Sequence, residues 1–248
     1  MTRTIGIHSF RRSTGKTFFS TNLSLLLAKE GWRVCLVDTD FQSPDISPLF
    51  GYETEDLPYT LNDYLDGRCK VEDIVYDVTD QAPEVRGRLY ILPASQKHED
   101  ITKILRQGYS VEKFADALRQ ISASLSLDAV VMDTSAGLTE ESLRSLALAD
   151  SVAVVMLPDQ QHYQGTAVMT DLAHKLKVSA VTLIVNQVPD VYDPAQVKQE
   201  IETKYQTPVT AVLPFVEECG SCERFFALEY PDHPLTVGLM QMVLGLLK

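Results

Sequence analysis

Short runs of apolar residues alternate along the chain with segments in which apolar residues recur every three or four positions. The runs are rich in Val, Ile and Leu, which indicates strands buried on both faces, and the second pattern is typical of helices. We therefore expect strands at 4–10, 33–40, 89–95, 127–135, 151–158, 180–188 and 209–215. Helices are expected at 16–29, 111–124, 140–149, 166–176 and 193–205, with a closing helix at 235–247.

This order of elements predicts an α/β fold. A strand, a helix and a second strand follow one another between residues 4 and 40, and such a unit implies parallel pairing. Its repetition predicts a doubly wound, mostly parallel sheet of about seven strands with helices on both faces. No Pro-, Gly- or Ser-rich linker divides the 248 residues, so a single domain over 1–248 is expected. Ligands of such sheets bind at the carboxyl ends of the strands.

The tripeptide Gly15-Lys16-Thr17 follows the first predicted strand and opens the next helix. In this context it is typical of a phosphate-binding loop, although Phe10 replaces the glycine that usually lies five residues before Gly15. Backbone amides at the helix N-terminus can cradle phosphate oxygens, and the Lys16 ammonium can reach the β- and γ-phosphates. The Thr17 hydroxyl is a candidate ligand of Mg²⁺.

Acidic residues end two of the other predicted strands. Asp133 ends "AVVMD" and is the candidate acidic partner of Thr17 at a Mg²⁺ site. Asp38 ends "VCLVD", where a carboxylate could orient or deprotonate an attacking water. The carboxyl ends of parallel strands share one edge of the sheet, so these side chains and the loop should lie together.

These residues resemble the ParA/MinD family of deviant Walker-box ATPases over nearly the whole chain. The family's loop reads Lys-Gly-Gly-x-Gly-Lys-Thr/Ser, which places Arg11 at the signature lysine and Arg12 and Ser13 at the two glycines. The family's second-strand and Walker B motifs are similar to "LVDTDFQSPDI" and "DAVVMDTSAGL". The phrases "YTLNDYLDG", "VEDIV", "LYILPASQ" and "YPDHPLT" also occur in the family's order.

The resemblance implies a cytoplasmic homodimer that sandwiches two ATP molecules, hydrolyses them slowly and is stimulated by a partner protein. Such switches position or partition a cargo, such as a plasmid or chromosome, the septum, a pilus or a carboxysome. The implied catalytic residues are Lys16, Asp38 and Arg11, and the implied Mg²⁺ site is Thr17 and Asp133 with Asp40 in the outer shell. The implied nucleotide contacts are Arg12, Ser13, Thr14, Gly15, Lys16, Thr17 and Phe18, with Asn186, Pro214 and Phe215 around the adenine.

The chain departs from the family at its defining lysine. Arginine grips phosphate bidentately but is bulkier, so one hypothesis is that Arg11 or Arg12 reaches the partner's ATP like an arginine finger. In the other, neither reaches the nucleotide, and the dimer is weak or hydrolysis is lost. Without glycine, Arg12 and Ser13 must keep ordinary φ angles or carry strain. A nucleotide-sensing adaptor or scaffold with little ATPase activity is therefore the alternative function.

Two cysteines and the overall charge affect the remaining interpretations. Cys219 and Cys222 leave open an Mrp-type iron–sulfur carrier, which bridges a cluster across its dimer, although incidental thiols are the simpler interpretation. A net charge of −12 does not favour nonspecific DNA binding. Five basic residues nevertheless lie in one region, namely Lys97, Lys103, Arg106, Lys113 and Arg119.

The closing helix and the start of the chain bear on location. The stretch "LTVGLMQMVLGLLK" is strongly apolar and has Lys248 as its one cation, whereas a membrane anchor of the amphipathic type needs a basic polar face. We expect this helix to pack in the core. No signal peptide and no apolar stretch of membrane-spanning length are recognised, so the cytosol, with reduced thiols, is the expected compartment.

Overall fold

The computed structural model describes residues 2–82, 85–176, 178–217 and 225–246. Within these ranges one sheet contains eight strands in the order β3-β4-β2-β5-β1-β6-β7-β8. The strands are β1 Arg3–His8, β2 Arg33–Thr39, β3 Tyr76–Asp77, β4 Arg88–Leu92, β5 Ala129–Thr134, β6 Ser151–Met156, β7 Ala180–Val188 and β8 Val209–Pro214. Every neighbouring pair is parallel except β3 and β4. The predicted α/β sheet is confirmed. It has eight strands where about seven were expected, and the additional one is the antiparallel edge strand β3.

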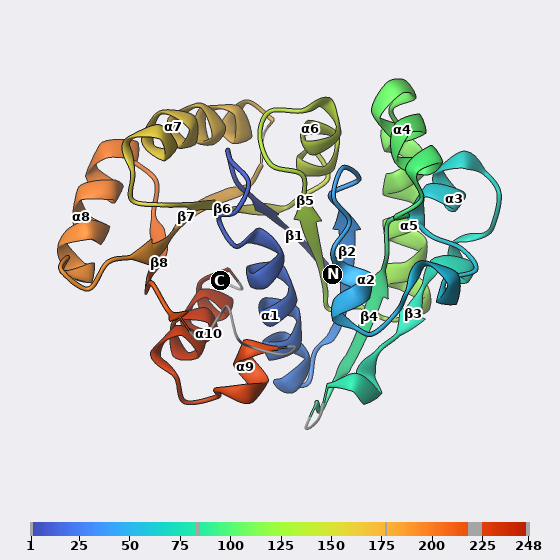
Figure 1. The fold of residues 1–248 in the computed structure, drawn as a ribbon, viewed down its shortest axis with the longest axis horizontal. Coiled ribbons are helices and arrows are strands. Elements are labelled where there is room, and N and C mark those ends of the chain that lie inside the picture. Colours follow the sequence, from blue (N-terminus) through green and yellow to red (C-terminus); the bar gives the residue numbers. More distant parts are fainter. Residues whose placement is uncertain (1, 83–84, 177, 218–224, 247–248) are drawn as a thin grey trace.

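The longer helices alternate with these strands, and all of them except α4 were expected from the pattern (Figure 1). They are α1 Lys16–Lys29, α4 His98–Gln107, α5 Val111–Ser124, α6 Glu140–Leu146, α7 Gln160–Lys175, α8 Pro194–Tyr205 and α10 Pro234–Leu246. Helix α7 begins ahead of the expected residue 166, because its first turn is too polar to show an apolar period. Short elements after β2 and before α10 were not expected; they are α2 Ile46–Leu49, η1 Thr54–Asp56, α3 Leu61–Asp66, η2 Val71–Ile74, η3 Thr79–Gln81 and α9 Phe226–Glu229.

The sheet separates two apolar layers, because successive strand residues point to opposite faces. On β2, Leu36 packs in the layer that contains α1, α9 and α10, whereas Cys35 and Val37 pack in the layer under α5 to α8. All three side chains are fully buried. Burial on both faces explains the near-continuous apolar strands and fixes their register.

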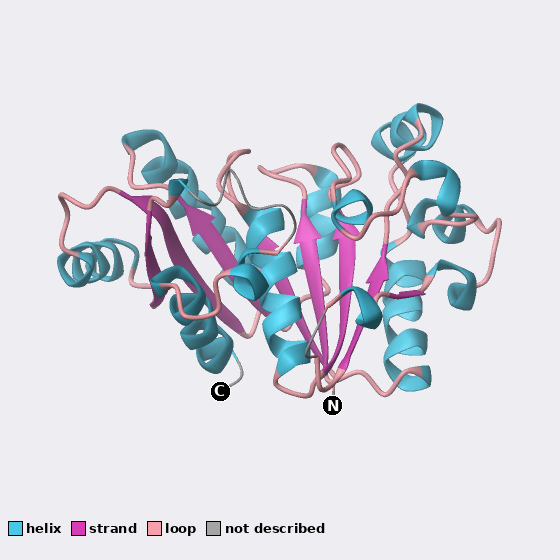
Figure 2. Cartoon of the chain, turned by 60° about the horizontal axis from the view of Figure 1, so that its bottom comes forward, coloured by secondary structure: helices cyan, strands magenta, loops and turns pink. Residues whose placement is uncertain are grey.

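The register brings the acidic strand ends together. In β2 and β5, Asp38 pairs directly with Asp133, and Ile7 of β1 pairs with Asp133 from the other side. Figure 2 shows that the parallel strands run to the same edge, where the loops that follow them gather. The loop after β1 therefore lies above both carboxylates.

Helix α10 packs against α1 and β8. Its Leu235 and Leu239 are buried, and Gly238 lies so close to β8 that an added Cβ would be 2.6 Å from Leu213 Cδ2. No helix in the part of the chain that the structure describes is long and apolar enough to cross a membrane. Cys219 and Cys222 lie outside the described residues, so the structure leaves the iron–sulfur interpretation as it was.

The basic residues at 97–119 are divided between α4, where they extend from the N-cap to the last turn, and α5, and several face acids or carbonyls. Lys103 pairs with Asp66 at 2.7 Å, Arg119 pairs with Asp116, and Lys113 donates to the Leu65 carbonyl. These contacts reduce the positive charge available to phosphates. DNA binding stays a prediction that the charge does not favour.

Candidate functional site

The loop of residues 9–15 turns from β1 into α1. Two of its residues have left-handed backbone, Ser13 at φ 61° and Gly15 at φ 95°. Gly15 is also confined by space, because a Cβ there would lie 3.0 Å from Asn186 Nδ2. Ser13 therefore carries the strain that the missing glycine would have avoided. Arg11 and Arg12 are exposed on this loop, whereas Lys16 is buried at its end.

Thr17 and Asp133 form the centre of the site. The Thr17 hydroxyl donates to Asp133 Oδ2 at 2.6 Å, and Asp133 Oδ1 is buried without a hydrogen-bond partner among the described residues. A hydroxyl and a carboxylate with an unused oxygen are the kind of ligands that Mg²⁺ takes from P-loop proteins. These two residues therefore fit a Mg²⁺ ion. Asp40 and Thr17 both line a cleft over the loop.

Asp38 lies beside Asp133 and is held by backbone amides. Asp40 N donates to Asp38 Oδ1 at 3.1 Å, and Ile46 N donates to Asp38 Oδ2 at 3.3 Å. Burial, and then the charge of Asp133, raise the pKa of Asp38 well above its usual range. Burial also raises the pKa of Asp133 to about 7, against the opposing hydrogen bond from Thr17 and the charge of Lys16. The site thus concentrates acidic groups that a cation would stabilise in the ionised form.

A cleft of about 310 Å³ lies over the loop. Arg12 and Asp40 line it, and Arg12 Nη2 donates to Gln42 Oε1 at 2.9 Å. This bond joins the loop after β1 to the segment after β2. The cleft is lined by Arg12, Ser13, Gly15, Lys16, Thr17, Phe18, Asp40, Ser43 and Asp45.

A second cleft, of about 340 Å³, shares Gly15 and Phe18 with the first. The register of β7 shifts between Val185 and Val188, and Gln187 has a φ of 55°. This irregularity aims Asn186 at the loop, where its Nδ2 donates to the Thr14 carbonyl at 2.9 Å. The cleft is lined by Gly15, Phe18, Asn186, Gln187, Pro214, Phe215, Val216, Glu217 and Leu235.

All the predicted site residues therefore lie at one edge of the sheet, around two adjoining clefts. A hollow of about 400 Å³ at the opposite edge, beside Thr4 and Leu118, brings no comparable polar groups together. The roles of individual residues, Arg11 in particular, stay predictions. Sequence reasoning missed Gln187, for which the sequence carries no signal.

Sequence reasoning also missed His8, although a lone polar residue in an apolar strand was a visible signal. The imidazole is fully buried beneath the loop, and its Nδ1 lies 2.7 Å from Thr134 Oγ1. The Thr134 hydroxyl donates to the Ile7 carbonyl, so it accepts from His8 Nδ1–H. Burial, and then the charge of Lys16, lower the pKa of His8 to about 3.

Comparisons with known proteins agree with this arrangement. A family model described as an AAA domain matches residues 2–184. The chain is 28% identical over 246 residues to an uncharacterized ATP-binding protein of Methanocaldococcus jannaschii, covering 98% of this chain and 87% of that protein. It is 31% identical over 159 residues to the septum site-determining protein MinD of Bacillus subtilis, covering 64% of this chain and 54% of MinD.

The fold is also found among solved structures. MinD of Pyrococcus horikoshii, solved in complex with Mg-ADP, superposes with a TM-score of 0.81 at 23% identity, covering 98% of this chain and 95% of that one. A ParA family ATPase from Chlorobium tepidum gives a TM-score of 0.77 at 18% identity, covering 98% and 99%. The chain belongs to the family of the matching AAA domain, and within it to the ParA/MinD type of P-loop ATPases.

Proposed function

We propose that this chain is an ATP-binding and ATP-hydrolysing switch that dimerises on ATP and positions or partitions a cellular cargo. The observation that carries the proposal is the arrangement of Thr17, Asp133 and Asp38 directly beneath a loop that presents Lys16. Nucleotide binding alone would not need a second buried carboxylate beside the predicted Mg²⁺ ligands. A carboxylate in the position of Asp38 is where a group that activates water would lie.

In this proposal the loop amides and Lys16 hold the phosphates, and the Lys16 ammonium offsets charge that develops on them. Thr17 and Asp133 would hold Mg²⁺, which when bound supplies positive charge beside the phosphate oxygens. Asp40 would act on that site from the outer shell. The base would occupy the second cleft, against Asn186 and the 214–215 turn.

Asp38 is the residue that we assign to the attacking water. Its two oxygens are oriented by the Asp40 and Ile46 amides, so the carboxylate has a fixed direction. Its raised pKa makes it a stronger base once ionised. It would orient the water and accept its proton.

Arg11 is the residue that we assign to the dimer contact. It is exposed on the loop and could reach a nucleotide bound by a second copy, where its guanidinium would stabilise developing charge. We expect sedimentation to show an ATP-dependent dimer that Arg11→Ala weakens and that Arg106→Ala, at an exposed arginine of α4, leaves intact. An ATP-dependent dimer unaffected by Arg11→Ala would remove Arg11 from this role.

The cargo and partner are proposed only as a class. Relatives include a flagellum site-determining protein of Helicobacter pylori and the antiactivator FleN of Pseudomonas aeruginosa, and a MinC:MinD complex is among the similar structures. The MinC:MinD complex supports a partner protein that binds this chain, and we propose that such a partner stimulates hydrolysis.

The second candidate function is a nucleotide-sensing adaptor with little turnover. The replacement of the two glycines by Arg12 and the strained Ser13 favours it, because both residues change the backbone over the phosphates. An adaptor would bind ATP and dimerise while hydrolysing it at the background rate. Measured turnover, compared with that of Asp38→Asn, separates the two functions.

A further inference from the structure

Gln96 joins two loops that flank the proposed hydrolytic site. It follows β4, the neighbour of β2, and its side chain is half-buried. Its Nε2 donates to the Pro44 carbonyl at 3.1 Å, and its Oε1 accepts from Thr54 Oγ1 at 3.0 Å. One carboxamide therefore holds both ends of the segment that contains α2.

This segment supplies one of the two amides that orient Asp38. The Ile46 amide lies two residues beyond Pro44 and donates to Asp38 Oδ2 at 3.3 Å. That distance is near the long end for a hydrogen bond, so a small movement of the backbone would break it. The buried side chains of Phe41 and Ile46 anchor the segment on either side, while Asp45 between them is exposed. Gln96 is placed to fix the backbone between these anchors.

The turn that carries Gln96 is itself held by helices α3 and α4. Ser95 N donates to Asn62 Oδ1 at 2.8 Å, and Ser95 Oγ donates to Asp100 Oδ2 at 2.7 Å. Asp100 is in turn bound by Arg68 at 2.6 Å. The hydrogen bonds from Ser95 and Arg68 outweigh the effect of burial and lower the pKa of Asp100, which keeps it ionised.

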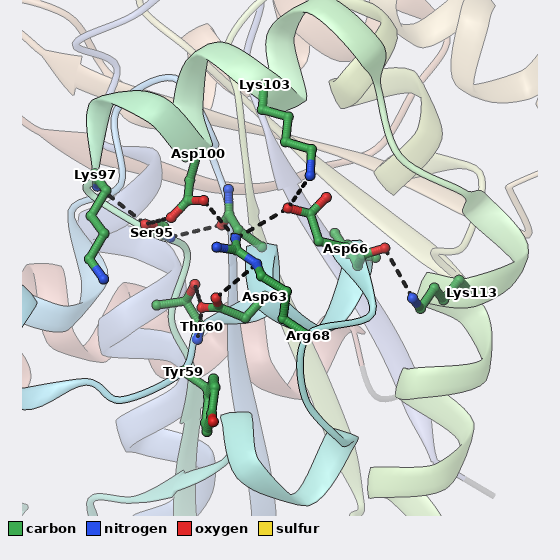
Figure 3. Close-up of polar contacts among 12 residues, drawn as sticks. Tyr59, Thr60, Asp63, Asp66, Arg68, Ser95, Lys97, Asp100, Lys103 and Lys113 are labelled. Carbon is green, nitrogen blue, oxygen red and sulfur yellow. Dashed lines mark hydrogen bonds and ion pairs between the residues drawn. The ribbon is translucent and has the colours of Figure 1, made fainter.

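Arg68 is the centre of this charged cluster. Figure 3 shows its guanidinium among the carboxylates of Asp63, Asp66 and Asp100, with Lys103 on the far side of Asp66. The cluster joins α3 to the first half of α4, on either side of Ser95. Arg68 and Lys103 of this cluster are half-exposed. A change in the charge at this surface can therefore alter the hydrogen bonds that hold Ser95 and, through it, Gln96.

We propose that Gln96 is a positioning residue for ATP hydrolysis, which acts by holding the backbone that orients Asp38, and that the Arg68 cluster holds Gln96 in turn. This inference rests on the proposed role of Asp38 in activating water. Gln96 touches neither cleft, so it should affect the rate of hydrolysis and leave the binding of ATP unchanged.

The test replaces Gln96 by methionine, which keeps the length of the side chain and removes both hydrogen bonds. We expect single-turnover hydrolysis at saturating ATP and Mg²⁺ to slow by about 5- to 20-fold, the size expected for one or two lost hydrogen bonds. The dissociation constant of ATP should stay within about two-fold, because no phosphate or base contact is removed. Gln107→Met, at an exposed glutamine that ends helix α4, is the matched control and should change neither quantity.

A double-mutant cycle shows whether Gln96 acts through Asp38. In an Asp38→Asn background, Gln96→Met should slow the residual hydrolysis by less than about two-fold, since coupled residues are not additive. Arg68→Met should slow hydrolysis less than Gln96→Met does, and should add nothing to it. An unchanged rate in Gln96→Met, or an equal loss in the Asp38→Asn background, would overturn the inference while leaving the proposed function intact. If Asp38→Asn hydrolyses ATP at the unaltered rate, both the proposed role of Asp38 and this inference fail.

A second measurement needs no turnover. Hydrogen–deuterium exchange should be faster in Gln96→Met than in Gln107→Met at the Ile46 amide, because its bond to Asp38 opens more often. Equal exchange at this amide in the two variants would show that Gln96 does not hold the segment, and would overturn the inference.

Discussion

The buried histidine beneath the loop makes the stability of the protein depend on pH in a predictable way. His8 is fully buried and donates through Nδ1–H to Thr134, while Nε2 has no hydrogen-bond partner among the described residues. A proton added at Nε2 would create a buried cation near Lys16. Burial, and then the charge of Lys16, accordingly lower the pKa of His8 from 6.5 to about 3.

The sign and size of the effect follow from this difference in pKa. The unfolded chain takes up the proton below pH 6.5, and the folded chain does so only near pH 3. The contribution of neutral His8 to the free energy of unfolding is therefore complete above pH 6.5 and is lost as the pH falls toward 3. At about 1.4 kcal/mol per pH unit, the loss is about 2 kcal/mol at pH 5 and approaches about 5 kcal/mol at pH 3.

The assay compares the protein with His8→Asn in urea, without nucleotide and with a chelator. The asparagine amide keeps a donor for Thr134 but does not titrate, and the smaller side chain lowers stability by an amount that does not vary with pH. The other titrating groups are common to both proteins and cancel in the difference. We expect the advantage of the unaltered protein at pH 7.5 to shrink by about 2 kcal/mol at pH 5.

A stability difference that stays constant between pH 7.5 and pH 5 would refute this reasoning, because His8 would then titrate alike in both states. A difference that widens as the pH falls would show that the folded protein stabilises the imidazolium, which contradicts burial beside Lys16.

Three further predictions concern the loop and its neighbours. A Cβ at Gly165 would overlap the ring of Phe10, so Gly165→Ala should lower the free energy of unfolding. In a Phe10→Ala background the overlap is absent, and the same substitution should raise the free energy of unfolding by about 1 kcal/mol, because alanine has the higher helix propensity. Ser13→Gly should stabilise the nucleotide-free chain by about 0.5 kcal/mol in urea unfolding by removing left-handed strain, and an unstable variant would contradict this. Asn186→Ala should cost about 1–3 kcal/mol by leaving the buried Thr14 carbonyl unpaired, and should weaken ATP binding in calorimetry; unchanged stability would show that water replaces the amide.

The features that could be predicted from the sequence are local or follow from the order of elements. The helix that begins at Lys16 is marked by Gly15 and by the strand before it, and both neighbours appear in the structure. Asp38 and Asp133 end apolar runs, and strands that run in parallel bring such ends together. Their direct pairing in neighbouring strands agrees with this expectation.

The features that could not be predicted depend on contacts between distant residues. Asn186 meets the Thr14 carbonyl only because β7 is irregular at Gln187, and no residue pattern marks that irregularity. Gln96 meets Pro44 and Thr54 because β4 lies beside β2 in the sheet, which the sequence does not specify. The two-residue strand β3 is likewise too short to carry a period, and it exists because β4 provides an edge.

Backbone strain in the loop could be predicted from the missing glycines, but the residue that carries it could not. Either Arg12 or Ser13 could have taken the positive φ of a missing glycine, and the structure assigns it to Ser13. Arg12 instead reaches Gln42 across the cleft. This contact depends on the shape of the whole loop.

The central claim is that Asp38 activates water for ATP hydrolysis at a site built by Lys16, Thr17 and Asp133. The most direct measurement is single-turnover hydrolysis of bound ATP by the full chain with Mg²⁺, compared with Asp38→Asn after ATP binding by each protein has been verified. Removal of a general base should slow hydrolysis by about 100-fold or more while ATP remains bound. Hydrolysis by Asp38→Asn at the rate of the unaltered protein would contradict the claim.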